Sequence, residues 1–136
     1  MKLHKAFFVF VSLMMVVAAV FSSASAKPSD EAVATLTVEQ ISFAADQEVT
    51  VYVTIANPTG HTIKVLAWYT PIPEVEGPLF AVTVDGEAAT YTGAIYKRPA
   101  PNDNDYIKLK AGESVTSAVP LSQYYDLSAS GVYAVT

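Results

Sequence analysis

The sequence contains no cysteine, and this absence excludes several kinds of chemistry at once. No disulfide can stabilise the fold, so an exported domain of this composition must be held together by its apolar core. A cysteine nucleophile and a thiolate metal site are excluded as well. This usage is in keeping with a bacterial exported protein.

Histidine is nearly as scarce, since His61 is the only one beyond the first 26 residues. A zinc site of the His-Glu-x-x-His kind needs two histidines on one face of a helix. A Ser-His-Asp arrangement would have to use His61, and no nucleophile-elbow sequence accompanies it. We therefore interpret His61 as a solvated turn residue, and we expect this chain to be no enzyme, with no catalytic residue, no metal ligand and no cofactor of its own.

The N-terminus has the three-part pattern of a secretory signal peptide. Lys2 and Lys5 give it a positive start, an almost unbroken apolar run covers residues 6–21, and small residues stand at Ala24 and Ala26. The apolar run is shorter than the roughly 20 residues that span a bilayer. We predict cleavage after Ala26 and a secreted or periplasmic product without membrane attachment.

Basic residues are few in the remaining chain. Without the two lysines of the signal peptide, the formal net charge changes from −5 to −7. An acidic domain of this kind repels phosphate backbones, so nucleic acid is excluded as a partner.

The sequence after the signal peptide predicts a short flexible leader, residues 27–32, and one all-β domain, residues 33–136. Apolar and polar residues alternate with a period of two, and no stretch of helical periodicity interrupts them. The predicted strands cover residues 33–43, 49–55, 61–68, 79–84, 87–92, 106–110, 113–121 and 131–136. Their number and their regular turns favour an immunoglobulin-like antiparallel β-sandwich.

Several turns and structural residues can be assigned within this frame. Asp85-Gly86 predicts a type I′ hairpin turn. A β-bulge near Val65-Leu66 would turn Trp68 toward the core and make it the large buried side chain of the sandwich. Leu127 and Tyr133, six residues apart across Gly131, have the spacing of a tyrosine corner, although a tyrosine that merely lies in a strand would look the same.

Carboxylates give a weaker signal. Asp103 and Asp105 could hold calcium through oxygen ligands, but the glycine and the distal glutamate of a calcium loop are missing. We interpret them as part of a solvated turn. Glu74 and Glu76, in the proline-rich connection, are assigned only to solubility.

The loop segment Tyr96-Lys97-Arg98-Pro99 is the most distinctive in the chain, because it joins two basic residues to an aromatic ring and a proline in an acidic domain. One interpretation is a docking loop that presents a stiff cationic surface to a protein partner. The other is that Lys97 and Arg98 pair with acidic neighbours. The sequence leaves both open.

An ordered set of motifs resembles the N-terminal non-catalytic domain of bacterial secreted zinc proteases, the deuterolysin and peptidyl-Lys metalloendopeptidase family. The motifs are Val65-Leu66-Ala67-Trp68-Tyr69-Thr70-Pro71, Tyr91-Thr92-Gly93, Tyr96-Lys97-Arg98-Pro99-Ala100-Pro101, Asp105-Tyr106, Tyr125-Asp126-Leu127-Ser128 and Gly131-Val132-Tyr133. In that family a β-sandwich precedes a zinc-binding catalytic domain, which is not found in this sequence. The resemblance also implies a last strand of the sandwich beyond Thr136, so we expect the final strand to be missing here.

The resemblance implies a non-catalytic accessory domain or pro-domain. It would act by contact with a metalloprotease catalytic domain, in the same chain or in a separate one, and zinc would belong to that domain. The alternative is a free-standing secreted binding module, such as an immunoglobulin-like protease inhibitor or an adhesion domain.

Overall fold

The computed structural model describes residues 31–136, so the expected cleavage site at Ala24 and Ala26 lies outside the described residues. The described part of the chain contains eight strands and three short 3₁₀ helices. The strands are β1 (Val33–Val38), β2 (Thr50–Ala56), β3 (Ile63–Leu66), β4 (Val82–Val84), β5 (Glu87–Ala88), β6 (Tyr106–Leu109), β7 (Ser114–Pro120) and β8 (Tyr133–Val135). The 3₁₀ helices are η1 (Ala67–Tyr69), η2 (Asp103–Asp105) and η3 (Leu121–Gln123). Each strand overlaps one of the predicted strand regions, and the all-β prediction is confirmed.

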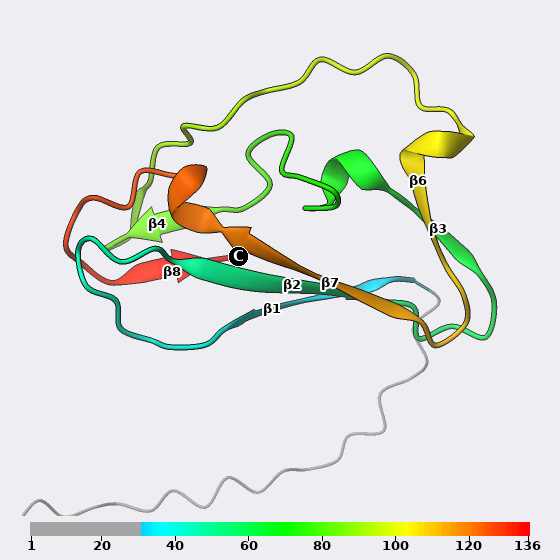
Figure 1. Ribbon diagram of the computed structural model, residues 1–136, viewed down its shortest axis with the longest axis horizontal. Coiled ribbons are helices and arrows are strands. Elements are labelled where there is room, and N and C mark those ends of the chain that lie inside the picture. The colour runs from blue at the N-terminus through cyan, green and yellow to red at the C-terminus, as the bar shows by residue number, and fades with distance from the viewer. Residues whose placement is uncertain (1–30) are drawn as a thin grey trace, which may run out of the picture.

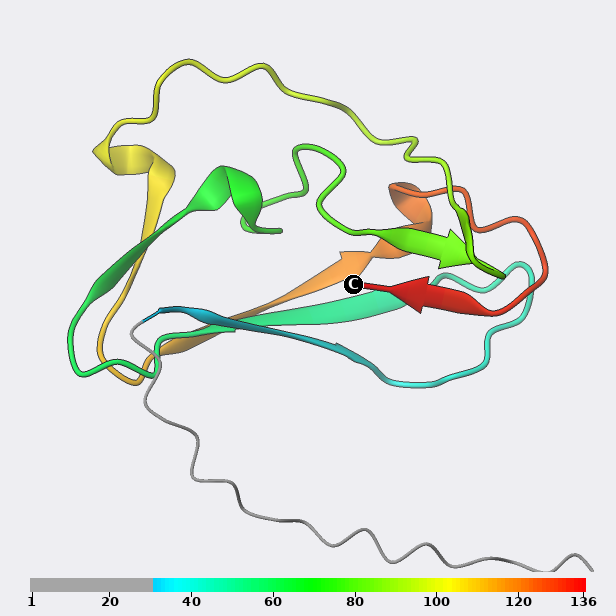
Figure 2. The same cartoon turned by 180° about the vertical axis from the view of Figure 1, so that it is seen from behind.

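The strands form three antiparallel sheets with the orders β1-β2-β7, β3-β6 and β5-β4-β8. Figure 1 and Figure 2 show β1, β2 and β7 side by side as one layer, with β4 and β8 across from it at one end and β3 and β6 at the other end. The architecture is therefore a small sandwich, in which β1 and β8 each have a partner strand on one side only.

The alternation in β2 explains why it is the central strand of its sheet. Val51, Val53 and Ile55 are buried, while the residues between them are half-buried. Val51 lies opposite the buried Val119 of β7. Burying these branched side chains stabilises the fold by about 1.5–3 kcal/mol each, and β2 contributes more buried residues to the core than any other strand of the described chain.

Two local predictions have different outcomes. The hairpin turn is confirmed, because Asp85 and Gly86 have φ values of 48° and 87° and join β4 to β5. The prediction that β1 continues to Phe43 is wrong. The strand ends at Val38, and Ile41 is 98% exposed.

The prediction that Trp68 is the buried centre of the core is also wrong. The β3–β6 pairing runs without a bulge from Ile63 opposite Leu109 to Leu66 opposite Tyr106. The chain then leaves the sheet in η1, where Trp68 is only half-buried. Buried core aromatics come instead from Phe80 and Tyr125, whose rings lie 6.4 Å apart edge to face.

The expected corner residues lie near the start of β8. The Tyr133 hydroxyl donates to the backbone carbonyl of Ala129, four residues upstream, at 2.7 Å. Leu127 is half-buried and packs against the core. The hydrogen bond from the Tyr133 hydroxyl to upstream backbone is the contact that a tyrosine corner requires.

Position 131 requires glycine because neighbouring side-chain atoms leave no room for a Cβ atom. A Cβ atom there would lie 2.5 Å from the Asp85 Oδ2 and 2.7 Å from the Val84 Cγ2. The Asp85 side chain cannot move aside freely, because its Oδ1 accepts a hydrogen bond from the backbone N–H of Val132 at 2.9 Å.

Gly131→Ala is expected to lower the free energy of unfolding by about 1–3 kcal/mol, the usual effect of forcing extra volume into a packed site. Gly60→Ala is the matched control, because a Cβ atom there meets nothing within 4 Å. Urea denaturation of both variants measures the difference. Equal stability of the two variants would contradict the close approach.

Candidate partner-binding surface

Arg98 is tied to the proline-rich connection by a two-point ion pair. Its Nε donates to Glu76 Oε2 at 2.7 Å, and its second guanidinium nitrogen donates to Glu76 Oε1. The hydrogen bond to Glu76 raises the pKa of Arg98 above its ordinary value. The planar fork of an arginine fits a carboxylate in this way, which fixes the orientation of both side chains.

The guanidinium group also lies near two aromatic rings. Its central carbon is 5.4 Å from the ring centre of Trp68 and 5.6 Å from that of Tyr96, within the range of a cation–π contact. The half-buried Trp68 ring therefore contacts the guanidinium group of Arg98 and does not fill the core.

A backbone bond holds the loop at a second point. The N–H of Tyr96 donates to the carbonyl of Glu76 at 3.1 Å. The loop residues at this point are exposed, with Ile95 at 73% and Tyr96 at 47%. We use the term Arg98 surface for Trp68, Glu76 and residues 95–99.

The Arg98 surface brings together three segments that are distant in sequence: η1, the proline-rich connection and the long loop before η2. The predicted contact residues Tyr96, Lys97, Arg98 and Pro99 are all exposed in it. Lys97 makes no ion pair or hydrogen bond with another residue of the described part of the chain. The pairing interpretation thus holds for Arg98, and the docking interpretation of the loop stays a prediction.

The assignment of Glu76 to solubility is wrong. Its side chain is only 10% exposed and forms the ion pair with Arg98. The two residues are separated by 22 positions, and no local pattern in the sequence connects them.

The other polar candidates are engaged in local contacts. Asp103 pairs with Lys64 at 3.0 Å, and this contact lowers the pKa of Asp103. Asp105 accepts a hydrogen bond from the backbone N–H of Asn102, which completes the cap of η2. His61 is exposed. Among residues 31–136, no group of three or more histidine, cysteine or acidic side chains is placed to hold a metal ion.

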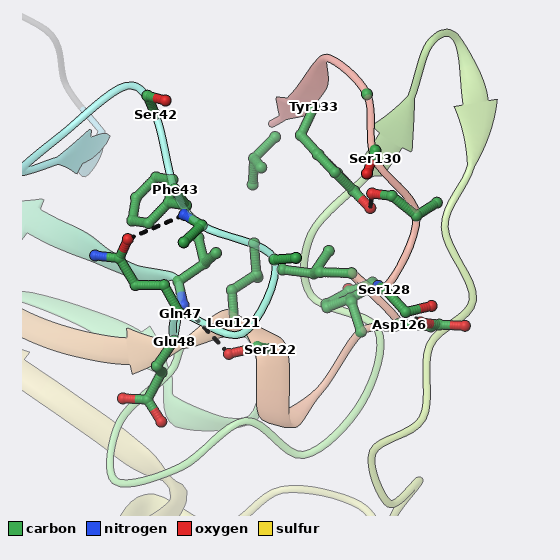
Figure 3. A pocket seen from close by; sticks show the side chains of 18 of the residues that line it. Ser42, Phe43, Gln47, Glu48, Leu121, Ser122, Asp126, Ser128, Ser130 and Tyr133 are labelled. Atoms are coloured by element: carbon green, nitrogen blue, oxygen red, sulfur yellow. Dashed lines mark hydrogen bonds between the residues drawn. The ribbon is translucent and has the colours of Figure 1, made fainter.

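A groove of about 920 Å³ opens at the end of the sandwich near η3. Figure 3 shows Phe43 and Gln47 on one wall, Ser128 and Tyr133 on the other, and Leu121 between them. Two hydrogen bonds fix the first wall. The backbone N–H of Ala44 donates to Gln47 Oε1, and the backbone N–H of Val49 donates to Ser122 Oγ. A smaller groove of about 360 Å³ lies farther along β1.

No helix in residues 31–136 has the length and apolar character needed to cross a membrane.

Comparison with known proteins relates the chain to a secreted enzyme. No established family description matches the sequence. The chain is 42% identical over 88 residues to an extracellular protease of Aeromonas hydrophila. The matched region is 65% of this chain but spans only 25% of the length of that protease. This chain is thus similar to a part of an extracellular protease.

Proposed function

We propose that residues 33–136 are a non-catalytic accessory domain or pro-domain of a secreted zinc metalloendopeptidase of the deuterolysin kind. The domain acts by contact with a protease catalytic domain, in the same polypeptide or in a separate one. The observation that carries the proposal is the 42% identity to one quarter of an extracellular protease. Zinc would belong to the catalytic partner, since residues 31–136 hold no cluster of metal-binding side chains.

The Arg98 surface supports a contact role. Its loop is ordered in advance by the Glu76 ion pair and by the two aromatic rings. A surface that is already ordered loses less conformational entropy on binding. Its composition, an arginine with exposed tyrosine and other apolar side chains, is the composition enriched at the centres of protein interfaces.

The proposal is tested by adding the purified chain to the Aeromonas hydrophila extracellular protease. We expect a concentration-dependent change in its proteolytic activity or in the yield of active enzyme after refolding from denaturant. An unrelated acidic β-sandwich of similar size is the control. If neither activity nor yield changes while the chain is folded by circular dichroism, the link to the protease is refuted.

The Arg98 surface makes its own prediction within this experiment. Arg98→Ala is expected to weaken binding to the protease by about tenfold or more, as interface anchors do. Lys97→Ala should have a smaller effect that decreases at high salt, because an exposed charge mainly assists the encounter. Titration calorimetry at low and high salt measures both effects.

The control for these variants is Lys110→Ala, which removes the same charge from an exposed residue in the turn between β6 and β7. This variant should bind as the unmodified chain does. An unchanged affinity in Arg98→Ala and Lys97→Ala would exclude the Arg98 surface as the contact site.

A further inference from the structure

The loop between β5 and η2 is held to the domain at every second residue. The carbonyl of Ala94 accepts a hydrogen bond from the Tyr91 hydroxyl at 2.8 Å. The N–H of Tyr96 donates to the carbonyl of Glu76 at 3.1 Å, and the Arg98 guanidinium donates to the Glu76 carboxylate. These contacts involve positions 94, 96 and 98, so one side of the loop is fixed to the body of the domain.

The same stretch of chain is extended. Residues 94–99 contain no helix, turn or bend, and a residue that precedes a proline, as Arg98 does, favours an extended backbone. Figure 1 and Figure 2 show the loop, in yellow-green, as a long arc that lies outside the sheets. An extended loop in this position presents one of its sides to solvent over its whole length.

Ile95 and Lys97 lie on the side that faces solvent. Side chains and backbone groups of an extended chain alternate between two sides, and the neighbouring positions 94, 96 and 98 face the domain. Ile95 is 73% exposed and Lys97 is exposed as well. Neither of them makes a backbone hydrogen bond with another of residues 31–136. Their backbone groups are therefore placed for a second extended backbone to pair with them.

This arrangement has the form in which an endopeptidase binds a substrate. The backbone of an extended segment adds as a strand to the enzyme, and alternate side chains enter its pockets. Lys97 has the long cationic side chain that an acidic specificity pocket accepts. Within residues 31–136, no ion pair or hydrogen bond holds its ammonium group.

The residues after Lys97 decide which bond would lie in the active site. Arg98 cannot enter a specificity pocket while its guanidinium is bonded to Glu76 and lies 5.4 Å from the ring centre of Trp68. Pro99, which follows it, has no N–H and a fixed φ. The bond between Lys97 and Arg98 is therefore the one presented. An enzyme that recognises the residue after the bond would need the Arg98 side chain, which Glu76 holds.

We propose that residues 94–99 are an inhibitory loop for serine endopeptidases that cleave after lysine or arginine, with Lys97 in the acidic pocket. The loop binds as a substrate does, and no covalent bond of either protein needs to break. Contacts at positions 94 and 96 on one side and at 98 on the other hold both ends of the bond in place. A loop fixed in this way loses little conformational entropy on binding, and protease–inhibitor complexes form with little backbone movement.

This activity is separate from the proposed contact with a metalloendopeptidase and does not depend on it. The test adds the purified chain to trypsin, whose specificity pocket is acidic, and follows hydrolysis of a small chromogenic lysine substrate. We expect competitive inhibition, in which the apparent KM rises and kcat is unchanged. Mass spectrometry after the incubation should find the bond between Lys97 and Arg98 intact. Absence of inhibition by the folded chain, or rapid cleavage after Lys97, would overturn the inhibitory loop.

Exchanging the residue in the pocket distinguishes this loop from any other contact. Lys97→Ala is expected to weaken the inhibition of trypsin by at least about hundredfold. Lys97→Phe should transfer the inhibition to chymotrypsin, whose pocket is an apolar slot. Lys110→Ala, which removes the same charge from an exposed turn, should inhibit trypsin as the unmodified chain does. Equal inhibition by the two alanine variants, or no inhibition of chymotrypsin by Lys97→Phe, would overturn the assignment of Lys97.

The contacts behind the loop are tested with Glu76→Gln, which keeps the shape of the side chain but removes the charge that holds Arg98. A loosened loop should become a substrate, and trypsin should cleave after Lys97 at least about tenfold faster than in the unmodified chain. Glu74→Gln is the matched control, because Glu74 lies in the same connection and is exposed. Equal resistance of both variants to cleavage would overturn the role of the Glu76 contacts in inhibition.

Discussion

Replacing Asn57 by aspartate is expected to lower the free energy of unfolding by about 3 kcal/mol, a large share of the 5–15 kcal/mol typical of a small domain. Asn57 is 1% exposed and lies where β2 turns toward β3. Its Nδ2 donates to the backbone carbonyls of His61, Leu109 and Lys110 at 2.7, 2.9 and 2.9 Å. An aspartate of the same shape has no hydrogen to donate, so carbonyl oxygens would face carboxylate oxygens in a buried site.

The acceptor atom of Asn57 completes the junction. Its Oδ1 accepts from the backbone N–H of Thr59 at 3.0 Å and from the Thr59 hydroxyl at 2.6 Å. One side chain thus joins the end of β2, the start of β3 and the turn after β6. Asn57→Ala should also be strongly destabilising, because it leaves the same carbonyls without a donor.

Urea denaturation followed by circular dichroism measures these effects, and the Tm is expected to decrease by more than about 10 °C. His61→Ala is the control, because the exposed imidazole takes no part in these bonds. Loss of stability in His61→Ala equal to that in Asn57→Asp would contradict the assigned role of the asparagine amide.

Tyr125→Phe is expected to lower the free energy of unfolding by about 2 kcal/mol, because it leaves two buried backbone groups without a partner. The Tyr125 side chain is 3% exposed. Its hydroxyl donates to the carbonyl of Phe80 at 2.7 Å and accepts from the N–H of Phe80 at 2.9 Å. The tyrosine therefore fixes the strand edge just before β4. Tyr133→Phe is the matched control and should cost less, because its hydrogen bond to Ala129 is exposed.

The Tyr125 effect should depend on pH in a defined direction. Burial raises the pKa of Tyr125 above its ordinary value, and the hydrogen bonding to Phe80 opposes this only in part. The folded phenol therefore stays neutral while the unfolded one ionises near pH 10. The stability from this group is complete below the unfolded pKa and is lost as the pH rises through the folded pKa.

Urea denaturation of the unmodified chain and of Tyr125→Phe at pH 7 and at about pH 10.5 tests this direction. The difference in unfolding free energy between the two proteins should be smaller at the higher pH. A difference that grows with pH would show that Tyr125 is ionised in the folded protein.

The sequence was informative where structure is set by neighbouring residues. The alternation from Thr50 to Ile55 predicts a half-buried central strand, and β2 is that strand. Asp85-Gly86 predicts a I′ turn because both positions need positive φ, and both have it.

Contacts between distant segments could not be predicted in the same way. Arg98 and Glu76 lie 22 positions apart, and Tyr125 and Phe80 lie 45 apart. Nothing in either local segment identifies its partner. For Trp68 the pattern was misleading: its apolar neighbours indicate a strand, but the chain leaves the sheet in η1.

The most direct test of a contact role is titration calorimetry of the chain against the Aeromonas hydrophila extracellular protease from which the region matching this chain has been deleted. The account predicts saturable one-to-one binding that is weakened by Arg98→Ala and retained by Lys110→Ala. No binding to a folded, catalytically competent preparation of that protease would contradict the account.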